Sequence, residues 1–227
     1  MRINLKKYLT DKYKGSISES SLQGPVITIS REYGCSAKEL SQNLVEKLNN
    51  LTNNKKNWAW INKEIFENTA KALNLKENRI KHIFEGKRMN VIESIIWSTS
   101  EKYYTSDAKI KNKIIEVVRS FAEKGNNIII GMGGVIISRD IPKSLHIKLH
   151  APFEWRIEMA AQKRGRTLEE MRKYATEIDQ KRNLLKESLS QKKDFNNFFD
   201  VSFNVMTLST DEITDSIIYL MKKKEFI

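Results

Sequence analysis

The residues best suited to chemistry lie in one short stretch, VITISREYGCSAKELSQNLVEKL, which spans residues 26–48. Its apolar start, residues 26–30, predicts a buried strand, and residues 36–48 predict a helix with one apolar face. The turn between them contains one glycine, and Lys38 stands near the start of the helix. Backbone N–H groups at a helix N-terminus attract phosphate, and a lysine adds a point charge, so this stretch predicts a phosphate-binding loop.

The loop departs from the usual spelling of such sites, GxxxxGK[ST]. Alignment on Lys38 puts Glu32 at the first glycine, Ala37 at the second, and Glu39 where a magnesium-binding hydroxyl is expected. The consensus alone therefore does not establish a nucleotide site. The Glu39 carboxylate could hold Mg²⁺ or could repel phosphate, and the sequence motif leaves both interpretations open.

Apolar patterns of strand and helix type alternate along the chain, which favours a mostly parallel sheet covered on both faces. The sequence predicts a three-layer α/β fold with a five-stranded sheet flanked by helices. The predicted strands are residues 26–30, 58–61, 127–131, 144–151 and 201–206. The predicted helices are residues 36–48, 62–73, 76–85, 91–104, 107–124, 153–164, 167–189 and 211–223.

Ligands of such sheets bind at the carboxyl ends of the strands. Three glycine- or proline-containing segments fall there: residues 31–38 after the first strand, 131–134 after the third, and 151–152 after the fourth. Their convergence predicts a single site at that edge of the sheet.

Four motifs, in order and spacing, resemble the cytidylate kinase-like family, relatives of CMP kinase with a degenerate phosphate loop. ITISREYGCSAKEL resembles its opening strand and loop, and WINKEIFENTA resembles its second strand and following helix. NIIIGMGGVIISRDIPKSLHIKLHAPFEWRI resembles its glycine-rich third strand, the strand ending in Ala-Pro and an arginine-bearing helix. EIDQKRNLL resembles its lid segment, D-x-x-R, and the resemblance runs from about residue 26 to 221.

The resemblance implies a P-loop nucleoside-monophosphate kinase fold that uses ATP and Mg²⁺. The polar residues 1–24 predict a flexible arm, and residues 25–227 predict one domain. The resemblance implies within that domain a helical acceptor-side insertion at about 62–106 and a helical lid at about 163–195. The donor nucleotide would contact Arg31, Gly34, Cys35, Ser36, Ala37, Lys38 and Glu39, with Glu39 a candidate for Mg²⁺. The catalytic residues would be Lys38, Arg156, Asp179 and Arg182. The acceptor would contact Asn62, Arg88, Gly131, Gly133 and Arg164.

These arginines fit phosphoryl transfer, which depends on positioning and charge neutralisation. Asp179 and Arg182 lie three apart on a predicted helix and can pair. Each lid arginine is also compatible with a solvated helix face, and Arg88 with a charged turn between two helices. The leading hypothesis is transfer of the γ-phosphate of ATP to a nucleoside monophosphate or another small acceptor.

Departures from the family pattern support a second hypothesis, a nucleotide-binding pseudo-kinase without catalysis. Ser36 and Ala37 replace a Gly-Gly pair, and a Cβ at position 37 crowds the turn. Met132 stands where the family often has arginine, and Asn62 where it often has aspartate.

Composition adds a third hypothesis, a basic nucleic-acid-associated protein, because the 227 residues carry a net charge of +12. The lysines are spread along the chain rather than gathered in a patch, which makes a nucleic-acid partner the weaker expectation. The single cysteine, Cys35, excludes an intramolecular disulfide, and no apolar run predicts a membrane span or secretory signal. We expect a cytoplasmic protein with no membrane partner; monomers are common among kinases of this fold, and the oligomeric state stays open.

Overall fold

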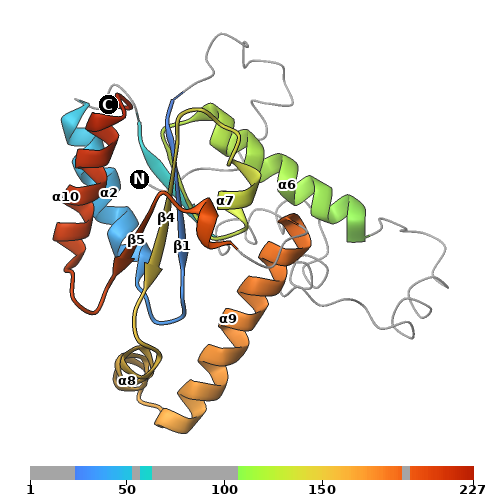
Figure 1. Cartoon of the computed structure of the whole chain (residues 1–227), viewed down its shortest axis with the longest axis vertical. Helices are drawn as coiled ribbons and strands as arrows, with labels where there is room; N and C mark the ends of the chain where they lie inside the picture. The colour runs from blue at the N-terminus through green and yellow to red at the C-terminus, as the bar shows by residue number, and fades with distance from the viewer. Residues whose placement is uncertain (1–23, 53–56, 63–106, 191–194) are drawn as a thin grey trace, which may run out of the picture.

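The computed structural model describes residues 24–52, 57–62, 107–190 and 195–227. Five parallel strands form one sheet in the order β2-β3-β1-β4-β5 (Figure 1). The strands are β1 (Val26–Arg31), β2 (Ala59–Asn62), β3 (Asn127–Ile130), β4 (Ser144–His150) and β5 (Val201–Asn204). This confirms the five-stranded parallel sheet that the sequence predicts.

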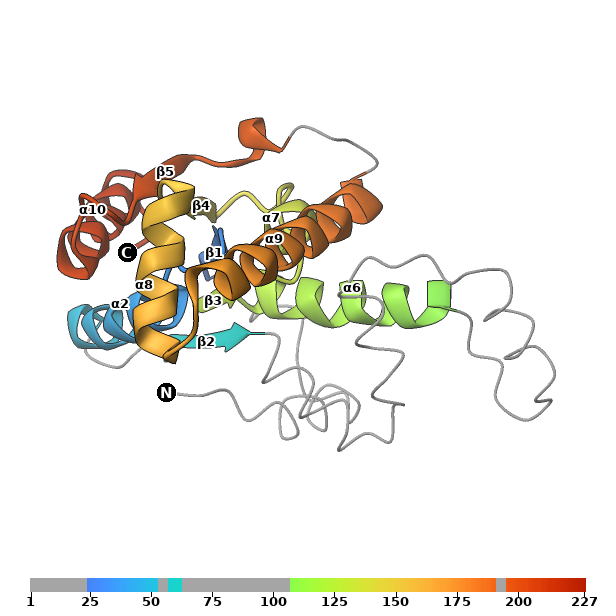
Figure 2. The same ribbon diagram turned by 90° about the horizontal axis from the view of Figure 1, so that it is seen from below.

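Helices cover both faces of the sheet, as Figures 1 and 2 show from two directions. One face carries α2 (Ala37–Leu51) and α10 (Thr210–Lys223), which contact each other and pack on the inner residues of β1 and β4. The other face carries α6 (Asp107–Lys124), the short α7 (Gly134–Ile137) and α9 (Leu168–Ser190). The helix α8 (Phe153–Arg164) lies beyond the carboxyl end of β4. The three-layer α/β fold is therefore confirmed.

The central position of β1 sets the place of the phosphate loop. Val26, Ile27 and Ile29 are fully buried, and the strand pairs with β3 on one side and β4 on the other. Because β1 lies between these two strands, the residues that follow Arg31 emerge at the middle of the carboxyl edge. The loop is thus surrounded by the ends of β3 and β4.

Most helix and strand boundaries lie within three residues of their predicted positions. The predicted end of the fifth strand is wrong by two residues, because the Asn204 side chain accepts a hydrogen bond from the Met206 N–H and turns the chain. The helix α7 was not predicted, since its four residues are too few for a periodic pattern. The helices predicted over 62–104 and the arm at 1–24 lie outside the described residues, apart from Asn62 and Gly24.

Within the described ranges, two helices have complete capping boxes. At α9 the Thr167 hydroxyl accepts from the Glu170 N–H, and the Glu170 carboxylate accepts from the Thr167 N–H. At α10 the Ser209 and Glu212 pair makes the same reciprocal contacts. No helix within the described ranges is long and apolar enough to cross a bilayer.

Ser209→Ala should lower the free energy of unfolding by about 1 kcal/mol, because the first turn of α10 loses its cap. Ser216→Ala, on the exposed face of the same helix, should change it by less than about 0.5 kcal/mol. Urea unfolding of the two variants and the parent protein measures both values. Equal losses for the two serines would contradict the role of the cap.

Candidate functional site

The loop between β1 and α2 approaches α8 closely at Gly34. Gly34 has φ +90°, in the left-handed region, and a Cβ built on it would lie 3.0 Å from the Arg156 Cβ. Three backbone hydrogen bonds brace the loop. The Glu32 N–H donates to the Leu149 carbonyl at 3.1 Å, the Cys35 N–H to the Glu32 carbonyl at 3.2 Å, and the Ala37 N–H to the Cys35 carbonyl at 3.0 Å. Glycine is required here both by backbone geometry and by lack of space.

The N-terminus of α2 differs from those of α9 and α10, because its N-cap residue, Ser36, makes no capping hydrogen bond through its side chain. Lys38 and Glu39 lie in the first turn, and both side chains are exposed. The first-turn N–H groups of a helix have no partners within the helix and carry a partial positive charge. This helix end can therefore accept an anion beside Lys38.

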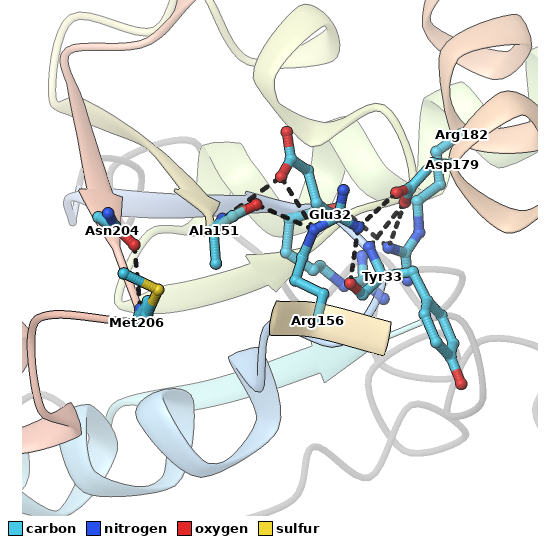
Figure 3. A network of polar contacts seen from close by, with 9 residues as sticks. Glu32, Tyr33, Ala151, Arg156, Asp179, Arg182, Asn204 and Met206 are labelled. Carbon is cyan, nitrogen blue, oxygen red and sulfur yellow. Dashed lines mark hydrogen bonds and ion pairs between the residues drawn. The ribbon is translucent and has the colours of Figure 1, made fainter. Parts of the chain in front are cut away.

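A buried arginine joins the loop to α8 and α9. Arg156, 6% exposed, donates from Nη1 to the Tyr33 carbonyl and to the Asp179 carboxylate, both at 2.8 Å, and from Nε to the Ala151 carbonyl at 3.1 Å (Figure 3). It also pairs with Glu32 at 3.4 Å. With these contacts the guanidinium holds the loop in one position.

Asp179 of α9 completes this network from the other side. Its carboxylate accepts the Tyr33 N–H at 2.7 Å and lies 3.4 Å from Arg182 Nη1. Arg182 in turn donates to the Arg31 carbonyl at 3.0 Å. The pairing of Asp179 with Arg182 is the one that their spacing predicts, and both residues reach the loop backbone.

Arg164 makes a third link between the loop and the α8–α9 hairpin. Its guanidinium carbon lies 5.7 Å from the ring centroid of Tyr33 and 5.4 Å from that of Tyr174. The two tyrosine rings meet edge to face at 5.3 Å. Cation–π contacts of this kind fix Arg164 over the loop.

A cavity of about 330 Å³ opens where the carboxyl ends of β1, β3 and β4 meet α9. Four cations line it: Arg31, Lys148, Arg182 and Lys186. We refer to it as the cationic cavity. Its lining also includes the turn 131–133, the rings of Phe195 and Phe199, and the carboxylates of Glu32, Asp179 and Glu187.

Burial makes the charges of the cationic cavity unfavourable. Burial lowers the pKa of Arg31, and the neighbouring Arg182 lowers it further. Burial likewise lowers the pKa of Arg182, and that of Lys186, where Lys148 is the second cause. Guanidinium groups stay charged in proteins, so these shifts express the free-energy cost of holding like charges away from water. A bound anion reduces that cost.

The turn after β3 shapes one wall of the cationic cavity. Gly131, Met132 and Gly133 all have left-handed backbones, with φ of 70°, 55° and 69°. Methionine in this region costs about 1–2 kcal/mol, offset by the burial of its side chain against α6 and α7. A Cβ on Gly131 would meet Arg31 Nη1 at 2.1 Å, so the bare glycine makes room for that guanidinium.

A second, apolar cavity of about 130 Å³ lies on the α2 and α10 side of the loop. Its lining includes Gly34, Ser36, Leu149, Trp155, Leu208 and Ile213. We refer to it as the apolar cavity. The two cavities therefore differ in polarity and border different segments of the loop, Ser30–Glu32 in one case and Gly34–Ser36 in the other.

The structure distributes the predicted site residues unequally. Gly34 and Ser36 are exposed on the loop, whereas Cys35 and Ala37 are buried, and burial raises the pKa of the Cys35 thiol to about 11. Arg31, Gly131, Gly133, Asp179 and Arg182 line the cationic cavity, and Arg156 is buried beside it. Asn62 ends β2, level with Ile130 of β3, and Arg88 lies outside the described residues.

Glu39 is the predicted magnesium ligand. Within the described ranges no group of three or more His, Cys, Asp or Glu side chains forms a metal site. Mg²⁺ in phosphotransfer sites is commonly held by one or two carboxylates together with phosphate oxygens and water. An exposed carboxylate beside an anion-accepting helix end fits that pattern, so Glu39 stays a candidate.

The sequence patterns did not indicate Lys148, Lys186 or Tyr33 as site residues. Lys148 left little signal, since polar and apolar residues alternate along its strand, SLHIKLH. Lys186 follows Arg182 by four residues, which puts both on one face of a helix. Tyr33 acts partly through its backbone N–H, which no residue pattern reveals.

The structure has parallel strands in the order β2-β3-β1-β4-β5 and a loop that leads into a helix whose N-cap side chain makes no hydrogen bond. Cations from several elements meet beside this loop. Together these features are those of a kinase-like α/β protein. The chain belongs to the cytidylate kinase-like family, whose model matches residues 26–206. This confirms the resemblance carried by the loop, the glycine-rich third strand and the lid segment.

Solved structures resemble the chain at low sequence identity. An uncharacterized protein from Eubacterium ventriosum is 16% identical, with a TM-score of 0.60, covering 88% of this chain and 99% of its own. Shikimate kinases from Acinetobacter baumannii, in complex with shikimate, and from Bacteroides thetaiotaomicron are each 12% identical, with TM-scores of 0.47 and 0.45. They cover 91% and 88% of this chain and 98% of their own. A search of curated proteins found no match.

Asp179→Ala should lower the free energy of unfolding by about 2–3 kcal/mol, because Arg156 and the Tyr33 N–H lose a charged partner in a partly buried place. Asp140→Ala is the matched control: Asp140 also pairs with an arginine, Arg119, but its side chain is 64% exposed. That change should cost less than about 1 kcal/mol. Urea unfolding distinguishes the two, and similar losses would contradict a role for Asp179 in holding the loop.

Proposed function

We propose that this protein transfers the γ-phosphate of ATP to a nucleoside monophosphate or another small acceptor. The observation that carries the proposal is the position of an uncapped helix end, with exposed Lys38, beside two cavities of opposite polarity. A nucleoside triphosphate would place its base in the apolar cavity and its phosphates on the helix end beside Lys38. Arg182, which lines the cationic cavity, would supply charge neutralisation of the kind that phosphoryl transfer requires.

The donor would lie along the loop. The backbone of residues 34–38 and the Lys38 ammonium would hold its phosphates, and Glu39 would help to hold Mg²⁺. The magnesium ion, when bound, neutralises charge on the phosphates. The apolar cavity would receive the base against the Trp155 ring, which offers a face for stacking.

The arginines would divide the remaining work. Arg182 lines the cationic cavity and stays partly exposed, so it can reach an anion there. Arg156 is nearly fully buried and its donors are engaged, so we assign it to positioning the loop rather than to contact with substrate. Arg164, stacked on Tyr33, would hold the α8–α9 hairpin, the proposed lid, over the loop.

Transfer of ³²P from [γ-³²P]ATP, with Mg²⁺, to a panel of nucleoside monophosphates and small phosphorylated or hydroxylated acceptors tests this function. We expect transfer to one acceptor class, and Lys38→Ala should lower kcat/KM by about 100-fold or more, since it removes charge from the donor phosphates. Lys47→Ala is the control on the same helix, where the lysine pairs with Asp215 at the surface. It should leave the rate unchanged.

Other outcomes of the same assay are also decisive. Stabilisation of the fold by ATP without any transfer would favour the pseudo-kinase, in which the loop binds nucleotide and reports its presence. If ATP neither reacted nor raised the Tm, the loop would not be a nucleotide site and the proposal would fail.

Trp155→Ala should raise the dissociation constant for ATP about tenfold, because stacking on an aromatic ring contributes on the order of 1–3 kcal/mol per base. Inorganic tripolyphosphate has no base, so its affinity should not change. Trp155→Phe, which keeps a ring, should bind ATP nearly as well as the parent protein. Equal weakening of ATP and tripolyphosphate would place the base elsewhere.

A further inference from the structure

Two lysines of the cationic cavity have no part in the proposed transfer. Lys148 lies on β4 level with Ser30, on the sheet face that packs against α7 and α9. Lys186 lies on α9, one turn after Arg182. Both line the same cavity as Arg31, and both are only partly exposed. Lys148 stands near the carboxyl end of a strand that is not at the edge of the sheet, where a charged side chain is favoured beside water or a partner.

The two ammonium groups are held at the end of the cavity formed by the segment before β5. Lys148 Nζ donates to the Asn196 Oδ1 at 3.3 Å. Lys186 Nζ lies 5.0 Å from the centroid of the Phe195 ring. These contacts position the ammonium groups without neutralising them, since neither partner carries a negative charge.

Carboxylates within the cavity do not balance the cations. Asp179 is shared by Arg156, Arg182 and the Tyr33 N–H, and Glu32 pairs with Arg156. Glu187 also lines the cavity, but among the described residues no ion pair joins it to either lysine.

Arg31 is the third cation without a carboxylate. Among the described residues its guanidinium makes no ion pair, and it lies against the bare face of Gly131. Burial lowers the pKa of both Arg31 and Lys186, so their charges are costly without an anion. Asp179 acts on Arg31 and Lys186, and Glu32 on Lys186, only at longer range. Among the described residues, these three cations from β1, β4 and α9 thus face one cavity without a direct ion pair to a carboxylate.

We propose that the cationic cavity binds a phosphate group, held by Arg31, Lys148 and Lys186, at a site separate from the loop that ends at Lys38. This goes beyond the proposed transfer, because it concerns a second anion and does not require turnover. Guanidinium and ammonium donors from three directions suit the tetrahedral oxygens of phosphate. The cavity volume, about 330 Å³, is at the small end of ligand sites and admits a phosphate monoester.

The phosphate has two sources with the same chemistry. It is either carried by the acceptor, whose organic part would contact the rings of Phe195 and Phe199, or it is a free phosphate ion that acts as an effector. Both require the same three cations, so the binding site is tested first and the source second.

Isothermal titration of the whole protein with inorganic phosphate at low ionic strength tests the site, with no ATP or acceptor present. We expect one binding event that Lys148→Gln and Lys186→Gln each weaken roughly tenfold or more. The double change to arginine, Lys148→Arg with Lys186→Arg, keeps the charges and should retain binding. Lys143→Gln, an exposed lysine before the other end of β4, is the matched control and should bind normally.

A separate comparison distinguishes this site from the loop. Phosphate binding should persist in Lys38→Ala and in the presence of saturating Mg·ATP. Loss of binding in either case would assign the phosphate to the loop and overturn the proposal, as would absence of binding or equal binding by the glutamine variants. A failure of γ-phosphate transfer would leave this titration unaffected, so the two proposals fail separately.

Once an acceptor is known, steady-state kinetics with added inorganic phosphate show whether the bound phosphate belongs to the acceptor or is a free ion. Competition between inorganic phosphate and the acceptor would show that the cavity holds the acceptor's own phosphate. A change in kcat without competition would show a free effector ion. In both cases the glutamine variants should abolish the effect of phosphate.

Discussion

The organisation of the site depends on one carboxylate. Asp179 accepts the N–H of Tyr33 and pairs with both Arg156 and Arg182, so a single side chain of α9 joins the loop after β1 to two arginines. Without it, two guanidinium groups would face each other at the carboxyl edge of the sheet, and a loop with one glycine would have few contacts to define its path. The sheet places these segments near one another, and the carboxylate makes them one unit.

This arrangement also explains how the loop can keep a defined shape although its sequence does not match the phosphate-loop consensus, GxxxxGK[ST]. In a glycine-rich loop the missing side chains let the backbone approach phosphate closely. Here side chains of the neighbouring helices, Arg156 and Asp179, hold the loop backbone in place. Cys35 and Ala37 can therefore be buried supports rather than phosphate ligands. Met132 stands where the resemblance leads one to expect an arginine. The cationic cavity still has positive charge without it, because Lys148 and Lys186 lie in its lining.

Much of the fold follows from the sequence, and less of the site does. The strands were predictable because buried parallel strands are short, apolar runs, and α6 because its apolar residues recur at helical spacing and Gly125 ends it with φ +70°. The pairing of Asp179 with Arg182 was predictable because both lie on one helix. The contact between Arg156 and the Tyr33 carbonyl joins residues more than a hundred positions apart, and the cationic cavity draws on five segments. Such contacts depend on tertiary packing, which local patterns do not encode.

The strand order has a consequence for biosynthesis. The strand β1 is made early, yet its two neighbours in the sheet, β3 and β4, begin only at Asn127 and Ser144. While the chain leaves the ribosome, this strand, with Val26, Ile27 and Ile29 fully buried in the folded protein, cannot pair with its native neighbours until about a hundred more residues have followed. At roughly 5–20 residues per second, that interval lasts about 5–20 seconds. Chaperones that recognise extended apolar segments have their longest opportunity at this strand.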